Sequence, residues 1–201
     1  MSEYESGLPP RGERQNKSNN NTTSFFRELI SIIKYVIVLL VVFFFIYQFF
    51  YAPVMVDGDS MEPTLSDGDY VLLNKFSDVE RFDIVLFPPP DDEETQYIKR
   101  VIGMPGDQVE YREDVLYIDG ENVDEFFLEN AEEEAAFYSS GDYSLLTLLG
   151  VDEVPAGQYF VLGDNRLNSR DSRSFGFVDE EAILGKASLR YWPFDRIGLV
   201  E

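Results

Sequence analysis

The stretch YVIVLLVVFFFIYQFFYAPVMV occupies residues 35–56 and contains no charged side chain. Gln48 is its only strongly polar residue. These 22 residues would extend roughly 33 Å as an α-helix, and the hydrocarbon core of a bilayer is about 30 Å thick. The stretch therefore predicts one membrane-spanning helix. We expect it to cover residues 28–52, with Pro53 marking its end.

The charges on either side of this stretch predict its orientation. Arg27 and Lys34 precede it, whereas Asp57 and Asp59 follow it. Basic residues favour the cytoplasmic side, so residues 1–27 should form a disordered cytoplasmic tail and residues 53–201 an extracytoplasmic domain. A cleaved secretory signal is the alternative, but its apolar core is normally only about 7–15 residues long. The sequence therefore favours a permanent single-pass anchor in the cell membrane, with the lipid bilayer as a partner.

The composition excludes several classes of function. The net charge of −22 opposes nucleic acid as a partner. Histidine and cysteine are both absent, which excludes a Ser-His-Asp triad, a Cys-His pair and the usual zinc sites. No Gly-rich phosphate loop or ligand cluster is present, so we expect neither a metal nor another cofactor.

Short β-type runs dominate the chain after Pro53. Gly and Asp separate them, as is typical of turns, and Asp107–Tyr111 with Val115–Ile118 indicates a hairpin. Further strands are expected at residues 70–73, 83–87, 159–162 and 182–192, and a helical turn or two at 130–137. The sequence thus predicts an all-β, mostly antiparallel domain behind one N-terminal transmembrane helix.

An acidic segment interrupts this domain. Fourteen carboxylates and no basic residue lie between Arg112 and Arg166. We expect residues 112–157 to form an acidic inserted lobe with a solvated surface. The spacing of a calcium-binding loop is missing, so a calcium site is the weaker interpretation.

In a chain without histidine, a catalytic serine needs lysine or a carboxylate as its base. A lysine amine has a reference pKa of about 10.4 and must become neutral to accept a proton. Burial can lower that pKa by up to about 3–5 units. Lys99 lies among Tyr97, Ile98, Val101 and Ile102 in a β-type run, which favours such burial.

Ser60 and Lys99 both lie in segments that resemble the type I signal peptidases, in the single-anchor form typical of Gram-positive bacteria. The resemblance rests on five blocks in the family's order: VDGDSMEPTL at 56–65, DGDYVL at 67–72, FDIVLF at 82–87, YIKRVIGMPGD at 97–107 and GDNRLNSRDSRSFG at 163–176. Together they cover most of residues 54–192.

The resemblance implies roles for individual residues. Ser60 would be the nucleophile and Lys99 the general base, and the Ser60 amide would donate to the oxyanion. Ser169 would hydrogen-bond the lysine amine and orient it. Four charged residues would hold the site together by ion pairs: Asp164, Arg100, Asp171 and Arg173. Some members complete the oxyanion hole with a serine hydroxyl where this chain has Gly58, so the origin of the second donor at that position stays open.

The resemblance also implies the substrates. They would be secretory preproteins with small residues at the −1 and −3 positions. An apolar wall would hold these residues and exclude bulky side chains. Five residues match the family's pocket positions: Val54, Val56, Val71, Leu86 and Ile98. The expected function is a membrane-bound serine endopeptidase that cleaves signal peptides.

Three alternatives remain open. The chain could be a specialised signal peptidase for one pilus or surface substrate, or an inactive membrane-anchored assembly protein. A self-cleaving repressor-type regulator also uses Ser and Lys, but the anchor and the negative charge oppose it.

Overall fold

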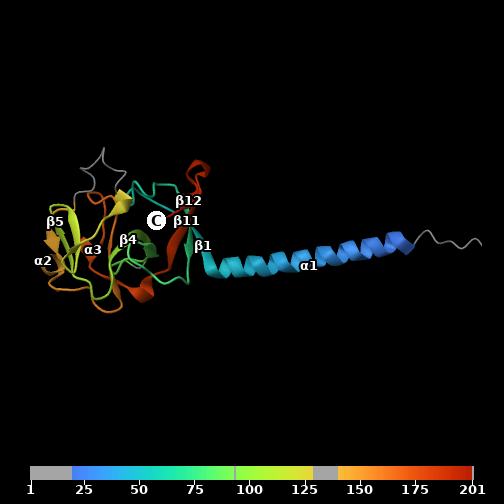
Figure 1. Ribbon diagram of the computed structural model, residues 1–201, viewed down its shortest axis with the longest axis horizontal. Coiled ribbons are helices and arrows are strands. Elements are labelled where there is room, and N and C mark those ends of the chain that lie inside the picture. Colours follow the sequence, from blue (N-terminus) through green and yellow to red (C-terminus); the bar gives the residue numbers. More distant parts are fainter. Residues whose placement is uncertain (1–19, 93, 129–139, 201) are drawn as a thin grey trace, which may run out of the picture. The chain divides into compact units, whose positions relative to one another are not determined.

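The computed structural model describes residues 20–92, 94–128 and 140–200 (Figure 1). The chain divides into two compact units, residues 1–47 and residues 48–201. We describe each unit by itself.

One long helix, α1 (Asn20–Phe50), fills the described part of the first unit and continues into the second. By length and composition, its Phe25–Phe45 segment could cross a membrane, a test that an N-terminal signal sequence also passes. The helix begins earlier than the expected residue 28, so residues 20–27 are helical rather than part of a disordered tail. The rest of the predicted tail, residues 1–19, lies outside the described residues.

The larger of two antiparallel sheets contains eight strands in the order β1-β2-β11-β3-β4-β9-β10, with β12 paired to β11. Their bounds are β1 Tyr51–Met55, β2 Tyr70–Asn74, β3 Ile84–Phe87, β4 Tyr97–Gly103, β9 Gln158–Leu162, β10 Val178–Asp179, β11 Gly185–Trp192 and β12 Gly198–Leu199. Pairing of β4 with β3 on one side and β9 on the other places β4 inside the sheet.

The smaller sheet has the order β7-β6-β5-β8. Its strands are β5 Val109–Arg112, β6 Val115–Ile118, β7 Glu121–Asn122 and β8 Tyr143–Ser144. Short helices in the described fold include α2 Leu145–Leu149, α3 Ser172–Phe175 and the 3-10 turns η2 Glu180–Ala182 and η3 Phe194–Arg196. The hairpin expected from the sequence is therefore formed by β5 and β6.

Apolar side chains from both sheets form three buried clusters in residues 48–201. One of them lies beneath the segment that follows β1 and includes Val56, Met61 and Leu65. The strand β2 contributes Val71 and Leu73 to this cluster, because alternate residues of a strand face the same side. These contacts fix the segment that carries Ser60.

The expected all-β, mostly antiparallel domain behind one helix is confirmed, with local differences. Pro53 does not end the helix, which stops at Phe50; it lies within β1, an edge strand where a missing N–H is tolerated. The last long strand starts at Gly185 rather than at residue 182, since η2 precedes it. The helical turn expected at 130–137 lies outside the described residues, as does part of the predicted lobe 112–157.

Candidate active site

A closed loop after β1 carries Ser60. The Val56 amide donates to the Asp69 carbonyl at 2.8 Å, and the Gly68 amide donates back to the Val56 carbonyl at 3.0 Å. Met61, directly after the serine, has no exposed surface. The base of the loop and the residue beside the serine are therefore both fixed, which orders the serine itself.

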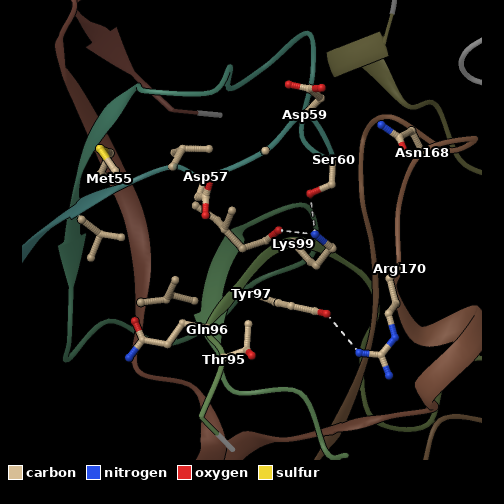
Figure 2. A pocket seen from close by; sticks show the side chains of 15 residues that line it. Met55, Asp57, Asp59, Ser60, Thr95, Gln96, Tyr97, Lys99, Asn168 and Arg170 are labelled. Carbon is tan, nitrogen blue, oxygen red and sulfur yellow. Dashed lines mark hydrogen bonds between the residues drawn. The ribbon is translucent and has the colours of Figure 1, made fainter. Parts of the chain in front are cut away.

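Lys99 comes from β4, inside the larger sheet. Its side chain is almost completely enclosed, with 4% of the residue exposed. Lys99 Nζ is hydrogen-bonded to Ser60 Oγ at 2.6 Å and donates to the Ile98 carbonyl at 2.9 Å (Figure 2). The structure thus brings together the two residues that the sequence indicated as a pair.

The surroundings of this amine favour its neutral form. Burial lowers the pKa of Lys99 from 10.5 to about 8, although the negative charges of Asp171 and Asp164 act in the opposite direction. Each of these carboxylates already has an arginine partner, which reduces its pull on the lysine proton. The amine can therefore lose its proton near neutral pH.

Arg100 and Asp164 form an ion pair with no exposed surface. Arg100 Nε and Nη2 donate to the two carboxylate oxygens at 2.9 and 2.7 Å, a bidentate geometry. Thr64 Oγ1 also donates to Asp164, at 2.6 Å. Through these bonds, β4, the turn after β9 and the Ser60 loop are linked beneath the serine.

Asp171 organises the turn that follows β9. Its side chain caps α3 and accepts from the Gly163 amide at 3.2 Å. Arg173 donates to both of its oxygens, each at 2.8 Å, and to the Arg166 carbonyl at 2.6 Å. All four charged residues expected to form ion pairs do so here.

Ser169 differs from its expected role. Its Oγ is buried and has no hydrogen-bond partner among the described residues, so the expected bond to the Lys99 amine is not formed. The hydroxyl packs instead against Gly163: a Cβ built on that glycine would lie 2.2 Å from Ser169 Oγ and 2.4 Å from the Ser60 carbonyl oxygen. The amine meanwhile finds its acceptors in Ser60 and Ile98.

The Gly58 amide is not a free oxyanion donor in this structure. It donates to Asp67 Oδ1 at 2.9 Å, across the loop that holds Ser60. Gly58 also adopts a left-handed backbone conformation, with φ at +84°, which other residues enter at a cost. By contrast, the Ser60 amide makes no hydrogen bond within the described residues.

A pocket of about 470 Å³ opens beside Ser60 and Lys99. Four of the expected pocket residues line it: Val54, Val56, Leu86 and Ile98. Val71 does not; it has no exposed surface and packs in the core, because its side chain lies on the inner face of β2. Sequence reasoning missed several polar and apolar lining residues: Met55, Asp57, Asp59, Thr95, Gln96, Tyr97, Asn168 and Arg170.

Comparison with known proteins shows which family the chain belongs to. The model of the family described as "Signal peptidase, peptidase S26" matches residues 29–192. The chain belongs to the signal peptidase I family. Its members are serine peptidases, so the protein is a hydrolase, and the resemblance seen in the five sequence blocks is confirmed.

Individual relatives agree with this assignment. Signal peptidase I of Bacillus caldolyticus is 44% identical over 151 residues, which are 73% of this chain and 82% of the relative. Signal peptidase IB of Staphylococcus aureus is 41% identical over 156 residues, covering 73% and 81%. A crystal structure of a signal peptidase I from Enterococcus faecalis matches with a TM-score of 0.52 and 43% identity, over 55% of this chain and 97% of that one.

Proposed function

We propose that this protein is a membrane-bound endopeptidase that removes N-terminal signal peptides from translocated preproteins, with Ser60 as nucleophile and Lys99 as general base. The observation that carries this proposal is the 2.6 Å contact between Ser60 Oγ and the buried Lys99 amine. A serine hydroxyl becomes a useful nucleophile only when a neighbouring base takes its proton.

The first half of the reaction forms an acyl-enzyme. Neutral Lys99 Nζ accepts the Ser60 proton while Oγ bonds to the scissile carbonyl carbon, whose π electrons move to its oxygen. The Ser60 amide donates to this oxyanion. As the carbonyl reforms, the C–N bond breaks and the new amino terminus of the mature protein takes the proton from Lys99.

The second half releases the signal peptide. Lys99 Nζ, neutral again, accepts a proton from water, whose oxygen bonds to the ester carbon. When this intermediate collapses, the bond to Ser60 Oγ breaks and the serine recovers its proton from Lys99. The same amine therefore acts as base and then as acid in both halves.

Five neighbouring residues would position this pair without touching the substrate. Arg100 and Asp164 link the Lys99 strand to the Ser60 loop, and Asp171 with Arg173 fixes the turn after β9. Ser169, in contact with Gly163, fills the space beneath the Ser60 carbonyl.

The pocket supports a preference for small residues at the −1 and −3 positions. Val56, Leu86 and Ile98 are buried and belong to the core, so the wall that they form cannot recede to admit a bulky side chain. The edge strand β1 borders the same pocket with Val54. An extended substrate could add to this edge and present alternate side chains to the wall.

We further propose that α1 is the membrane anchor, in a chain organised as a tail, an anchor of about residues 28–50 and a peptidase domain with an acidic lobe. Arg27 and Lys34 lie in its N-terminal half, whereas Asp57 and Asp59 follow it; this favours a cytoplasmic N-terminus and a peptidase domain outside, where preproteins emerge.

The test is cleavage of a preprotein in lipid vesicles by the full-length protein and by Ser60→Ala and Lys99→Ala. We expect both variants to lose at least about 10³-fold in kcat, as removal of a catalytic nucleophile or base does. Lys75→Ala removes an exposed lysine and is the matched control. Full activity in either active-site variant would refute the proposal.

A further inference from the structure

The oxyanion of the proposed reaction has one evident donor, the Ser60 amide. A second donor is expected at such a site, because each well-placed donor accelerates acyl transfer by about 10²–10³-fold. Residue 58 has no side chain to supply it, and its amide is bonded to Asp67. Another residue that lines the pocket can supply the missing donor.

Most other donors in the pocket are already engaged or lie far from the serine. Thr95 and Arg170 donate to exposed carboxylates, and Arg170 also donates to the Tyr97 hydroxyl at 3.0 Å. Figure 2 shows that hydroxyl facing Arg170, away from Ser60, and shows Gln96 at the opposite end of the pocket. These four residues are poorly placed to reach the oxyanion.

Asn168 lies at the serine end of the pocket (Figure 2). It belongs to a turn in which the Asn168 amide donates to the Asn165 carbonyl at 3.1 Å and to Asn165 Oδ1 at 3.2 Å. Asn165 in turn donates from its backbone to the Ser60 carbonyl at 3.1 Å, and from its side chain to the Asp59 carbonyl at 3.2 Å. The turn that carries Asn168 is thus bonded directly to the backbone of the nucleophile.

The side-chain amide of Asn168 is exposed and has no hydrogen-bond partner among the described residues. An amide NH₂ group offers two donors and carries no charge. It can therefore stabilise a developing oxyanion without disturbing the protonation of Lys99. A side-chain asparagine serves as an oxyanion donor in subtilisin.

We propose that the Asn168 side chain is the second oxyanion donor and hence a further catalytic residue. When Ser60 Oγ bonds to the scissile carbon, the carbonyl oxygen gains negative charge and accepts from Asn168 Nδ2–H as well as from the Ser60 amide. This role rests on the proposed function, since it requires attack by Ser60.

The first experiment measures preprotein cleavage by full-length wild type, Asn168→Ala and Asn168→Asp. Asn168→Ala should lower kcat by about 10²-fold and change KM less than about threefold, because the bond forms only in the transition state. Asn168→Asp keeps the shape but replaces the donor with a negative charge, so it should be at least as slow. Leu167→Ala, which trims an exposed neighbour, is the matched control and should retain wild-type kcat.

The second experiment uses a peptide aldehyde with alanine at −1 and −3 as a transition-state analogue. Ser60 Oγ adds to its carbonyl and creates the same oxyanion, with no leaving group. Its inhibition constant should rise for Asn168→Ala by about the factor lost in kcat. A non-cleaved peptide bound to Ser60→Ala, with and without Asn168→Ala, should show equal affinity.

Two results would overturn the inference. One is a kcat within threefold of wild type for Asn168→Ala, or recovery in Asn168→Asp. The other is equal loss of aldehyde and non-cleaved peptide binding, which would mean that Asn168 binds the ground state. The proposed function is tested separately. Activity remaining in Ser60→Ala would refute it, whatever result the Asn168 variants give.

Discussion

Lys99 is a cationic side chain placed where its charge is unfavourable. Burial lowers its pKa to about 8, and the two nearby carboxylates only partly offset this effect. The difference from 10.5 corresponds to roughly 3 kcal/mol of destabilisation of the charged form in the folded protein. Arg100 and Arg173 neutralise the carboxylates that would otherwise keep the amine protonated.

The pKa of Lys99 predicts how activity depends on pH. In the proposed reaction only the neutral amine accepts the Ser60 proton, so kcat/KM should rise with pH, by about tenfold per unit well below pH 8, and level off above about pH 9. Initial rates of preprotein cleavage between pH 5.5 and 10 measure this. A flat profile from pH 6 to 9 would contradict the assignment of Lys99 as the base.

The same pKa predicts a stability effect for Lys99→Met. The folded pKa of about 8 lies below the unfolded value of about 10.5, so the unfolded chain binds more protons between these pH values and wild-type stability rises with pH across that window. The variant lacks this proton and should be more stable by about 1–3 kcal/mol at pH 7, an advantage that shrinks towards pH 10.5. Thermal unfolding by circular dichroism at pH 7 and pH 10 checks both points; equal gains at the two values would exclude this cause.

At the scale of elements, the site depends on a close approach between the turn after β9 and the Ser60 loop. The Asn165 amide donates a hydrogen bond to the Ser60 carbonyl. Gly163, which has no side chain, leaves room for Ser169 beside that carbonyl. The bidentate Arg100–Asp164 pair links the same turn to β4. These contacts fix the relative positions of the serine and the lysine, which come from segments far apart in sequence.

Gly163→Ala should disrupt this approach. The added methyl group would lie 2.4 Å from the backbone carbonyl oxygen of Ser60, a contact that rotation of a side chain cannot relieve. We expect kcat to fall by at least about 10²-fold, because displacement of a reacting group by about 1 Å costs that much. Gly198→Ala is the matched control, since a Cβ there meets no atom within 4 Å, and it should behave as wild type. Near-normal cleavage by Gly163→Ala would show that the turn and the loop can separate without loss of function.

The whole molecule consists of two units that differ in how much of their apolar surface is buried. Residues 48–201 contain all three buried apolar clusters, whereas the membrane-length segment of α1, Phe25–Phe45, has no buried residues in this structure. The second unit therefore has the cores that independent folding requires.

A chain truncated to residues 48–201 should fold and retain the site. We expect its kcat/KM on a short soluble peptide to stay within about threefold of the full-length value, because the pocket and the Ser60–Lys99 pair lie in this unit. Cleavage of a preprotein in lipid vesicles should fall at least about tenfold, since the effective concentration that anchoring provides is lost. Unchanged cleavage in vesicles would refute a role for α1 in anchoring. A truncated Ser60→Ala variant controls for contaminating peptidases.

Much of this architecture could be predicted locally. Apolar runs, turn residues and alternation indicated one long helix, the β5–β6 hairpin and the strands β2, β3 and β9, because each signal lies within a few neighbouring residues. The predicted start of α1 and the predicted position of Pro53 at the end of the helix were wrong. Helix ends carry weak signals, and the pairing of Pro53 with Leu72 in an edge strand is a long-range contact.

By itself, the sequence narrowed the chemistry: without histidine or cysteine, a serine peptidase needs lysine or a carboxylate as its base, and the motifs around Ser60 and Lys99 indicated the candidate pair. The tertiary structure decided how that chemistry is arranged. It placed Val71 in the core, engaged the Gly58 amide with Asp67, left the Ser169 hydroxyl without a partner and set Asn168 beside the serine. These features depend on which side chains meet across strands and loops, and such contacts form only when distant segments pack together.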